Sequence, residues 1–163
     1  MSVKKVHHSW STVETWCAQL AIKILKSDWR PDYVVGLTRG GLTPAVMLSH
    51  LLSVPMHTLK VSLRDDDPNG SETNCWMAED ITDGKNILII DDINDTGATL
   101  KWIREDWHSS VAGLGPDPRM WWHDRIKVAV LVDNLSSNER VDFAADEINK
   151  AEDPSWIVFP WEK

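Results

Sequence analysis

Three aspartates and a turn of small residues follow one apolar segment of the chain. Residues 87–100 read I-L-I-I-D-D-I-N-D-T-G-A-T-L, so Asp91 and Asp92 stand at the end of the apolar run and Asp95 follows shortly after. The turn over residues 96–99 offers hydroxyls and uncovered backbone N–H groups where a helix is expected to begin, which suits a phosphate monoester. Acidic side chains beside a phosphate make chemical sense only if a cation or a ribose ring lies between them. The stretch therefore predicts a site for a phosphorylated sugar held with a divalent metal ion.

A second turn whose residues could bind a ligand is T-R-G-G-L, residues 38–42. It follows another apolar run, and its glycines, Gly40 and Gly41, would let the backbone approach a ligand closely. The planar guanidinium of Arg39 can hold a phosphate through two hydrogen bonds. An ordinary strand–turn–helix connection explains this turn equally well, so its interpretation depends on the first stretch.

Composition and charge exclude several classes of function. The formal net charge of −8 over 163 residues disfavours a nucleic-acid partner, which would need a basic surface. No apolar run approaches the roughly 20 residues of a membrane span, and the first ten residues lack the apolar core of a signal peptide. We therefore expect a cytoplasmic protein with no membrane partner. Cys17 and Cys75 have neither pairing nor metal-ligand spacing, which favours two reduced thiols.

The elements that must position these turns alternate between strand and helix. Continuous apolar runs predict strands at residues 33–37, 56–62, 87–90, 127–132 and 155–159. Helical spacing predicts helices that begin at a capping box on Ser11, at residue 43 and near Gly97. Buried strands alternating with helices are typical of a parallel sheet covered on both faces. We expect one α/β domain over residues 1–163, with ligands beyond the carboxyl ends of the strands at the topological switch point.

Three segments lack a clear period. Residues 64–84 are polar and rich in Pro and Gly, and a structureless stretch of this length is typical of a functional loop or of disorder. Residues 109–124 form a second irregular segment. Residues 136–150 favour a helix by propensity, although V-D-F-A-A-D within them also suits a short strand.

Two motifs carry a resemblance to a known family. The stretch I-L-I-I-D-D-I-N-D-T-G-A-T resembles the phosphoribosyl pyrophosphate signature of type I phosphoribosyltransferases, and T-R-G-G-L resembles their pyrophosphate loop. The order of segments, including the terminal W-I-V-F-P-W at residues 156–161, is most similar to bacterial xanthine-guanine phosphoribosyltransferases. The resemblance covers nearly the whole chain except an apparent insertion around residues 105–125. It implies the type I fold, with a twisted, mostly parallel sheet, a flexible lid and a small C-terminal hood, and it favours the strand within residues 136–150.

The resemblance implies transfer of ribose 5-phosphate from phosphoribosyl pyrophosphate to a purine nitrogen, with release of pyrophosphate. Asp91 and Asp92 would bind the ribose hydroxyls, directly or through Mg²⁺, and Asp95 would act at the purine N7 as general base or acid. The 5-phosphate would be wrapped by Asp95, Thr96, Gly97, Ala98 and Thr99. Pyrophosphate would be held by Arg39, Gly40 and Gly41, after a Thr38–Arg39 peptide that is expected to be strained or cis.

The C-terminal segment, residues 133–163, would bind the base. Trp156 would stack on the purine beside Ile157. Family members that use 6-oxopurines place a lysine after the strand equivalent to residues 127–132, but here Asp133 and Asn134 follow it. A carboxylate accepts from an exocyclic amine and cannot donate to a carbonyl. Xanthine, guanine or hypoxanthine is therefore expected alongside an aminopurine, or a base read by Asn134.

The expected lid at residues 64–84 also departs from the family. Its start reads Ser62-Leu63 where a Ser-Tyr pair is usual, and it carries Arg64 followed by three aspartates, residues 65–67. Either an additional metal ion binds these acids, or turnover is slow, or the loop is merely solvated.

Two other functions remain open at this level. A regulatory nucleotide-binding protein of the same fold is disfavoured by the intact D-D-I-N-D and, in its RNA-binding form, by the acidic charge. An orotate- or uracil-type enzyme is disfavoured by the W-I-x-x-P-W ending. Relatives implied by the resemblance assemble as dimers or tetramers, and a homodimer or homotetramer is expected here.

Overall fold

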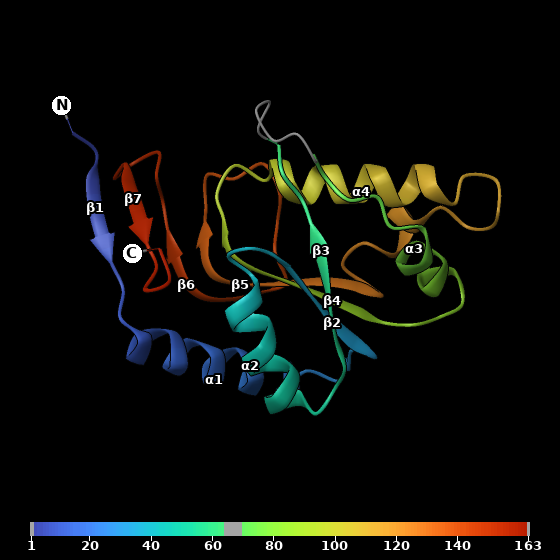
Figure 1. Cartoon of the computed structure of the whole chain (residues 1–163), viewed down its shortest axis with the longest axis horizontal. Coiled ribbons are helices and arrows are strands. Elements are labelled where there is room, and N and C mark those ends of the chain that lie inside the picture. Colours follow the sequence, from blue (N-terminus) through green and yellow to red (C-terminus); the bar gives the residue numbers. More distant parts are fainter. Residues whose placement is uncertain (1, 64–69, 163) are drawn as a thin grey trace.

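A sheet of five parallel strands forms the centre of the computed structural model, which describes residues 2–63 and 70–162 (Figure 1). Its order is β3–β2–β4–β5–β6, and every neighbouring pair is parallel. The strands are β2 (Tyr33–Thr38), β3 (Met56–Lys60), β4 (Ile87–Asn94), β5 (Ile126–Asn134) and β6 (Phe143–Ile148). The predicted α/β fold with a parallel sheet is thus confirmed, as is the preference for a strand within residues 136–150.

Helices cover both faces of this sheet. The helices α1 (Trp10–Lys26) and α2 (Leu42–Leu52) lie on one face, and α3 (Cys75–Thr82) and α4 (Ala98–Ser110) lie on the other (Figure 1). Successive strand residues alternate between the two cores: Leu88 and Ile90 pack with α1 and α2, whereas Ile87 and Ile89 pack with α3 and α4. Both faces are buried, which is why the strands read as continuous apolar runs.

The chain order places a topological switch point between β2 and β4. From β2 the chain crosses through α2 to β3 on one side, and from β4 it crosses through α4 to β5 on the other. The turns after β2 and β4 therefore diverge and leave a crevice at the carboxyl ends of these two strands, where ligands bind in open α/β sheets.

A small second sheet stands beside the main one. It pairs β1 (Lys4–His7) in parallel with β7 (Ser155–Val158), with Lys5 opposite Trp156 (Figure 1). The strand β7 was expected from its sequence, but β1 was not, because K-K-V-H is short, polar and mostly exposed. This sheet corresponds to the predicted C-terminal hood.

The predicted lid is only partly a loop. Residues 75–82 form α3, capped by the side chain of Asn74, which accepts from Met77 N. Met77 and Ile81 are buried against the core under α4, so this half of the segment is anchored. The expectation of a structureless stretch up to residue 84 was wrong because two apolar turns were hidden among polar neighbours. The acids at 65–67 and Arg64 lie outside the described residues.

Other differences are smaller. The helix α1 is capped by Ser9, whose hydroxyl accepts from Thr12 N, and not by Ser11. The insertion consists of the last turn of α4, turns and a short 3₁₀ helix, η1 (Pro118–Trp121). None of the helices within the described ranges is long and apolar enough to cross a membrane.

Candidate active site

The two predicted turns meet at the switch point. The residues Gly36 of β2 and Ile90 of β4 are partners in the sheet, so the segments that follow them emerge side by side. We call residues 38–41 the arginine loop and residues 95–99 the phosphate turn. The Thr38–Arg39 peptide is cis, one of the two alternatives expected from the sequence.

Two glycines allow the arginine loop to lie directly on β4. A β-carbon at Gly40 would overlap the carboxylate of Asp92, and one at Gly41 would overlap the carbonyl oxygen of Ile90 and approach Leu37 N to 2.8 Å. Because backbone atoms cannot move aside as side-chain ends do, only glycine fits at Gly41. The glycines thus bring Arg39 to the acidic end of β4.

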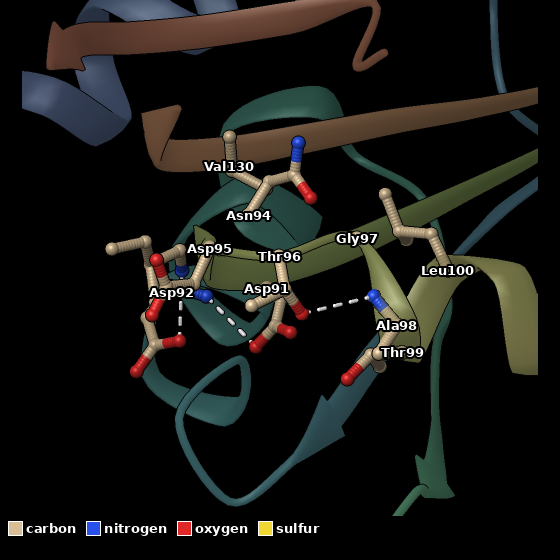
Figure 2. A pocket seen from close by; sticks show the side chains of 11 residues that line it. Asp91, Asp92, Asn94, Asp95, Thr96, Gly97, Ala98, Thr99, Leu100 and Val130 are labelled. Atoms are coloured by element: carbon tan, nitrogen blue, oxygen red, sulfur yellow. Dashed lines mark hydrogen bonds between the residues drawn. The ribbon is translucent and has the colours of Figure 1, made fainter. Parts of the chain in front are cut away.

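The aspartate pair at the end of β4 is held by its own backbone. Asp91 Oδ1 accepts from Asp92 N at 2.9 Å, and Asp92 Oδ1 accepts from Ile93 N at 2.8 Å (Figure 2). Removal from water and the neighbouring carboxylate of Asp92 raise the pKa of Asp91. Removal from water also raises the pKa of Asp92, and the charge of Glu162 adds to the effect. Within residues 2–63 and 70–162, no cationic side chain forms an ion pair with either acid.

This pair fits a hard divalent cation. Two carboxylates whose negative charges are disfavoured by burial and by each other gain most from an added positive charge. Magnesium is usually bound by one or two carboxylates together with water and substrate phosphates, and this donor set matches Asp91 and Asp92.

The phosphate turn leads from β4 into α4. Residues 91–100 and Val130 line a pocket of about 220 Å³ here (Figure 2). Gly97 takes φ of 89° and caps α4 without a side chain, while Thr96 Oγ1 accepts from Ala98 N at 3.3 Å. The N–H groups of Thr99 and Leu100, in the first turn, have no partner within a helix. The turn and the helix N-terminus therefore present donors and a partial positive charge to an anion.

A segment after β5 braces the phosphate turn. We call residues 134–139 the bracing segment. Asn134 Nδ2 donates to the carbonyl oxygen of Asp95 at 2.9 Å, and Asn138 N donates to that of Thr96 at 3.1 Å. Glu139 lies so close to Gly97 that a β-carbon there would meet its Cγ at 2.7 Å. The turn is thus held from outside by backbone and side-chain contacts.

The bracing segment is itself fixed by two polar side chains. Asn94 Nδ2 donates to the carbonyl oxygen of Glu139 at 2.8 Å, and in Figure 2 Asn94 points away from the aspartate pair. The carboxylate of Glu139 accepts two hydrogen bonds from Arg104 of α4, at 2.6 and 2.7 Å. Because the Glu139 side chain is only 10% exposed, this bidentate pair is shielded from water and connects α4 to the bracing segment.

Asn134 positions the phosphate turn. It is buried, its amide donates to Asp95, and its oxygen accepts from Ser136 N, Ser136 Oγ and Lys150 N. The acceptor sites of its side-chain oxygen are therefore all used within the protein. The prediction that Asn134 reads a base stays a prediction, which its side-chain oxygen does not support.

Asp133 also faces elsewhere. Its Oδ1 accepts from Asn94 Nδ2 at 2.9 Å, and the residue lines a separate hollow with the bracing segment and Arg140. Burial raises the pKa of Asp133, the bond from Asn94 lowers it, and Glu147 on the paired strand raises it. One oxygen of this carboxylate is thus engaged by Asn94, and the expectation that Asp133 reads an exocyclic amine stays a prediction.

A larger cavity of about 720 Å³ joins the arginine loop to the hood. Trp156, which is 57% exposed, lines it with Arg39, Gly40 and Asp92, as expected. The adjacent Ile157 is buried in the core, because successive residues of β7 point to opposite faces. Its side chain is therefore turned away from the cavity, and the contact of Ile157 with a base stays a prediction.

The residues that sequence reasoning missed near the site include three with polar or aromatic side chains that bear on the base. Trp161 and Glu162 line the large cavity, and Lys150 Nζ lies 3.0 Å from Asp95 Oδ1. The terminal P-W motif was a signal for Trp161. Lys150 sits in a polar turn after β6, and nothing local distinguishes it from a solvated lysine.

Comparison with known proteins identifies the family of the chain. Residues 8–162 match the family described as the phosphoribosyl transferase domain. The chain belongs to the phosphoribosyltransferase family. Among its curated relatives are a xanthine-guanine phosphoribosyltransferase of Cereibacter sphaeroides, 29% identical over 98% of this chain and 87% of that protein, and a hypoxanthine-guanine phosphoribosyltransferase of Schizosaccharomyces pombe, 26% identical over 99% and 91%. A crystal structure of a purine phosphoribosyltransferase from Pyrococcus horikoshii is similar, with a TM-score of 0.70 and 28% identity over 98% of this chain and 95% of that one.

Proposed function

We propose that the protein is a purine salvage enzyme, a Mg²⁺-dependent phosphoribosyltransferase that joins a purine to the ribose of phosphoribosyl pyrophosphate. One observation carries this proposal: the arginine loop lies against the aspartate pair, and Arg39, Asp92 and Trp156 line one cavity beside the phosphate turn. The cavity and the pocket of the phosphate turn share Asp92, so the residues proposed for the pyrophosphate, the ribose, the base and the phosphate adjoin one another.

Phosphoribosyl pyrophosphate would lie across the crevice. Its 5-phosphate accepts from the N–H and hydroxyl groups of the phosphate turn, which is braced before the ligand arrives. Its ribose hydroxyls face Asp91 and Asp92. Its pyrophosphate lies on the arginine loop, where Gly40 leaves the backbone accessible and Arg39 supplies a bidentate donor.

The purine would stack on Trp156 with its N7 edge toward Asp95. A purine ring nitrogen forms the new bond to the ribose C1 as the C1–oxygen bond breaks, and pyrophosphate leaves with that electron pair. The proton on N7 passes to Asp95. Positive charge that develops on the ribose is favoured by Asp91 and Asp92, and negative charge on the leaving group by Arg39.

Magnesium would be held by Asp91 and Asp92. When bound, it would supply a positive charge that offsets the negative charge developing on the leaving pyrophosphate. The elevated pKa values of the two acids support a counter-ion at this place. Assembly into a homodimer or homotetramer and a cytoplasmic location stay predictions.

Release of pyrophosphate tests the proposal. Purified protein with phosphoribosyl pyrophosphate and Mg²⁺ should release pyrophosphate when hypoxanthine, guanine or xanthine is added, and not without a base. Excess chelator should abolish release, and added Mg²⁺ should restore it. Asp95→Asn should lower kcat by roughly 100- to 10,000-fold, the range for a general acid or base. Absence of release with every purine would overturn the proposal and favour a regulatory nucleotide-binding protein.

A further inference from the structure

Lys150 lies where the base and the proton acceptor would meet. Its Nζ is 3.0 Å from Asp95 Oδ1 and 6.0 Å from the centre of the Trp156 ring. Its side chain is only 18% exposed, whereas the Asp95 side chain is 43% exposed. A surface lysine gains little from such a pair. This one is shielded at the corner between a carboxylate and the aromatic face proposed to carry the purine.

The position of Lys150 is fixed through Asn134. The side-chain oxygen of Asn134 accepts from Lys150 N at 3.0 Å, while its amide nitrogen donates to the carbonyl oxygen of Asp95 at 2.9 Å. One buried amide therefore connects the turn after β6 with the turn after β4. It sets the two charged side chains at a fixed separation, as a preorganised pair requires.

The pair matches one edge of a purine. A 6-oxopurine presents O6, an acceptor, beside N7, and a 6-aminopurine presents an amine donor at the same place. An ammonium group has three donors and no acceptor. With Asp95 accepting from N7–H, Lys150 has donors left for O6, but it can only repel the hydrogens of a 6-amino group.

We infer that Lys150 is a specificity-determining residue, which donates to the O6 of 6-oxopurines next to Asp95 and excludes 6-aminopurines. The inference rests on the proposed function, which places the base on Trp156. It reverses the expectation drawn from Asp133, whose carboxylate is bonded to Asn94. The cation for O6 comes from the turn after β6, and not from the end of β5.

Binding of two nucleotides tests the inference directly. Inosine 5′-monophosphate and adenosine 5′-monophosphate share the phosphate and ribose and differ in the group at C6. Isothermal titration should show that the wild-type protein binds the inosine nucleotide about 10- to 100-fold more tightly, the range for a hydrogen bond to a charged group. Lys150→Met should lose most of this preference, chiefly through weaker binding of the inosine nucleotide.

A matched control is Lys4→Met, which removes an exposed Lys–Asp pair, Lys4 Nζ to Asp153 at 3.1 Å, outside the cavity. It should keep the preference. Equal affinity of the wild-type protein for both nucleotides would overturn the inference, and so would a Lys150→Met variant that weakens both equally. If the nucleotides are discriminated but no base releases pyrophosphate, the proposed function fails while the role of Lys150 in recognition stands. If adenine and hypoxanthine react equally well, the proposed function stands and the role of Lys150 in recognition fails.

Discussion

The phosphate turn and the arginine loop adjoin the ends of neighbouring strands, but they are held in different ways. The turn is enclosed by the bracing segment, which bonds to Asp95 and Thr96 and packs on Gly97. The backbone of the arginine loop lies on β4, yet the guanidinium of Arg39 is exposed and makes no hydrogen bond or ion pair with another described residue. One side of the proposed site is therefore prepared for the 5-phosphate, which phosphoribosyl pyrophosphate keeps through the reaction, and the other side is left adaptable, for the pyrophosphate that leaves and the base that varies.

Among the changes that compare the two ways of holding the site, the largest effect is expected on the adaptable side. Arg39→Met should lower kcat/KM for phosphoribosyl pyrophosphate by about 100- to 1,000-fold, as loss of one donor to developing negative charge does. The melting temperature should stay the same, because the side chain supports nothing among the described residues. Arg140→Met, at another exposed arginine, serves as control. A melting temperature lowered by several degrees in Arg39→Met would contradict the contrast between the two regions.

A change on the prepared side should instead cost stability. Gly97→Ala places a side chain at φ of 89° and against Glu139, which adds about 1–2 kcal/mol of backbone strain to about 1–3 kcal/mol of overpacking. Urea unfolding measures the loss, and affinity for phosphoribosyl pyrophosphate should fall with it. Gly113→Ala, at φ of 80° with open space around it, isolates the strain alone. Equal losses in both variants would show that the bracing segment contributes nothing.

Trp156, the residue proposed to stack on the base, belongs to the adaptable side of the site. Trp156→Leu should raise the KM of the purine by about 10- to 100-fold, because stacking of a base on an aromatic ring contributes about 1–3 kcal/mol. Stability should hardly change, since the ring is exposed. Trp76→Leu alters another exposed tryptophan away from the cavity and should leave the KM unchanged. An equal rise in the KM of phosphoribosyl pyrophosphate would place the ring elsewhere in the reaction.

The smallest effect concerns the aspartate pair between the two regions. The pKa of Asp91 is raised in the folded state, so the unfolded chain releases this proton first. Its contribution to stability is complete below about pH 4, the unfolded value, and is lost as pH rises through the folded pKa. Without Mg²⁺, the free energy of unfolding should decline less over this range in Asp91→Asn than in the wild type. Asp28→Asn, an exposed acid, should keep the wild-type slope.

The sequence was sufficient to predict the site where the functional residues directly follow a clear apolar pattern. The apolar run of β4, its two acids and the small turn after it lie in one segment, so the positions of Asp91, Asp92 and the phosphate turn could be predicted locally. The helix α3 was missed because its few apolar residues lie within a polar segment, and β1 because its support comes from β7, at the opposite end of the chain.

Side-chain directions were harder to predict than positions. Asp133 and Asn134 were expected at the base, but cross-strand bonds to Asn94 and contacts with Asp95 and Lys150 occupy them. These partners are distant in sequence, and no local sequence pattern predicts them. The same holds for Lys150, which pairs with Asp95 only because β6 and β4 end at one edge of the sheet.

The strand β7 also limits how the protein can vary in length. Trp156 faces the cavity and Ile157 the core, so one residue added to or deleted from β7 ahead of Trp156 would exchange them, with an aliphatic chain under the base and an indole forced into a filled interior. Insertions near Gly113, where the backbone is surrounded by open space, carry no such penalty. Tolerance to changes in chain length should therefore differ sharply between β7 and the turn at Gly113. A library of single-residue insertions would measure this difference position by position.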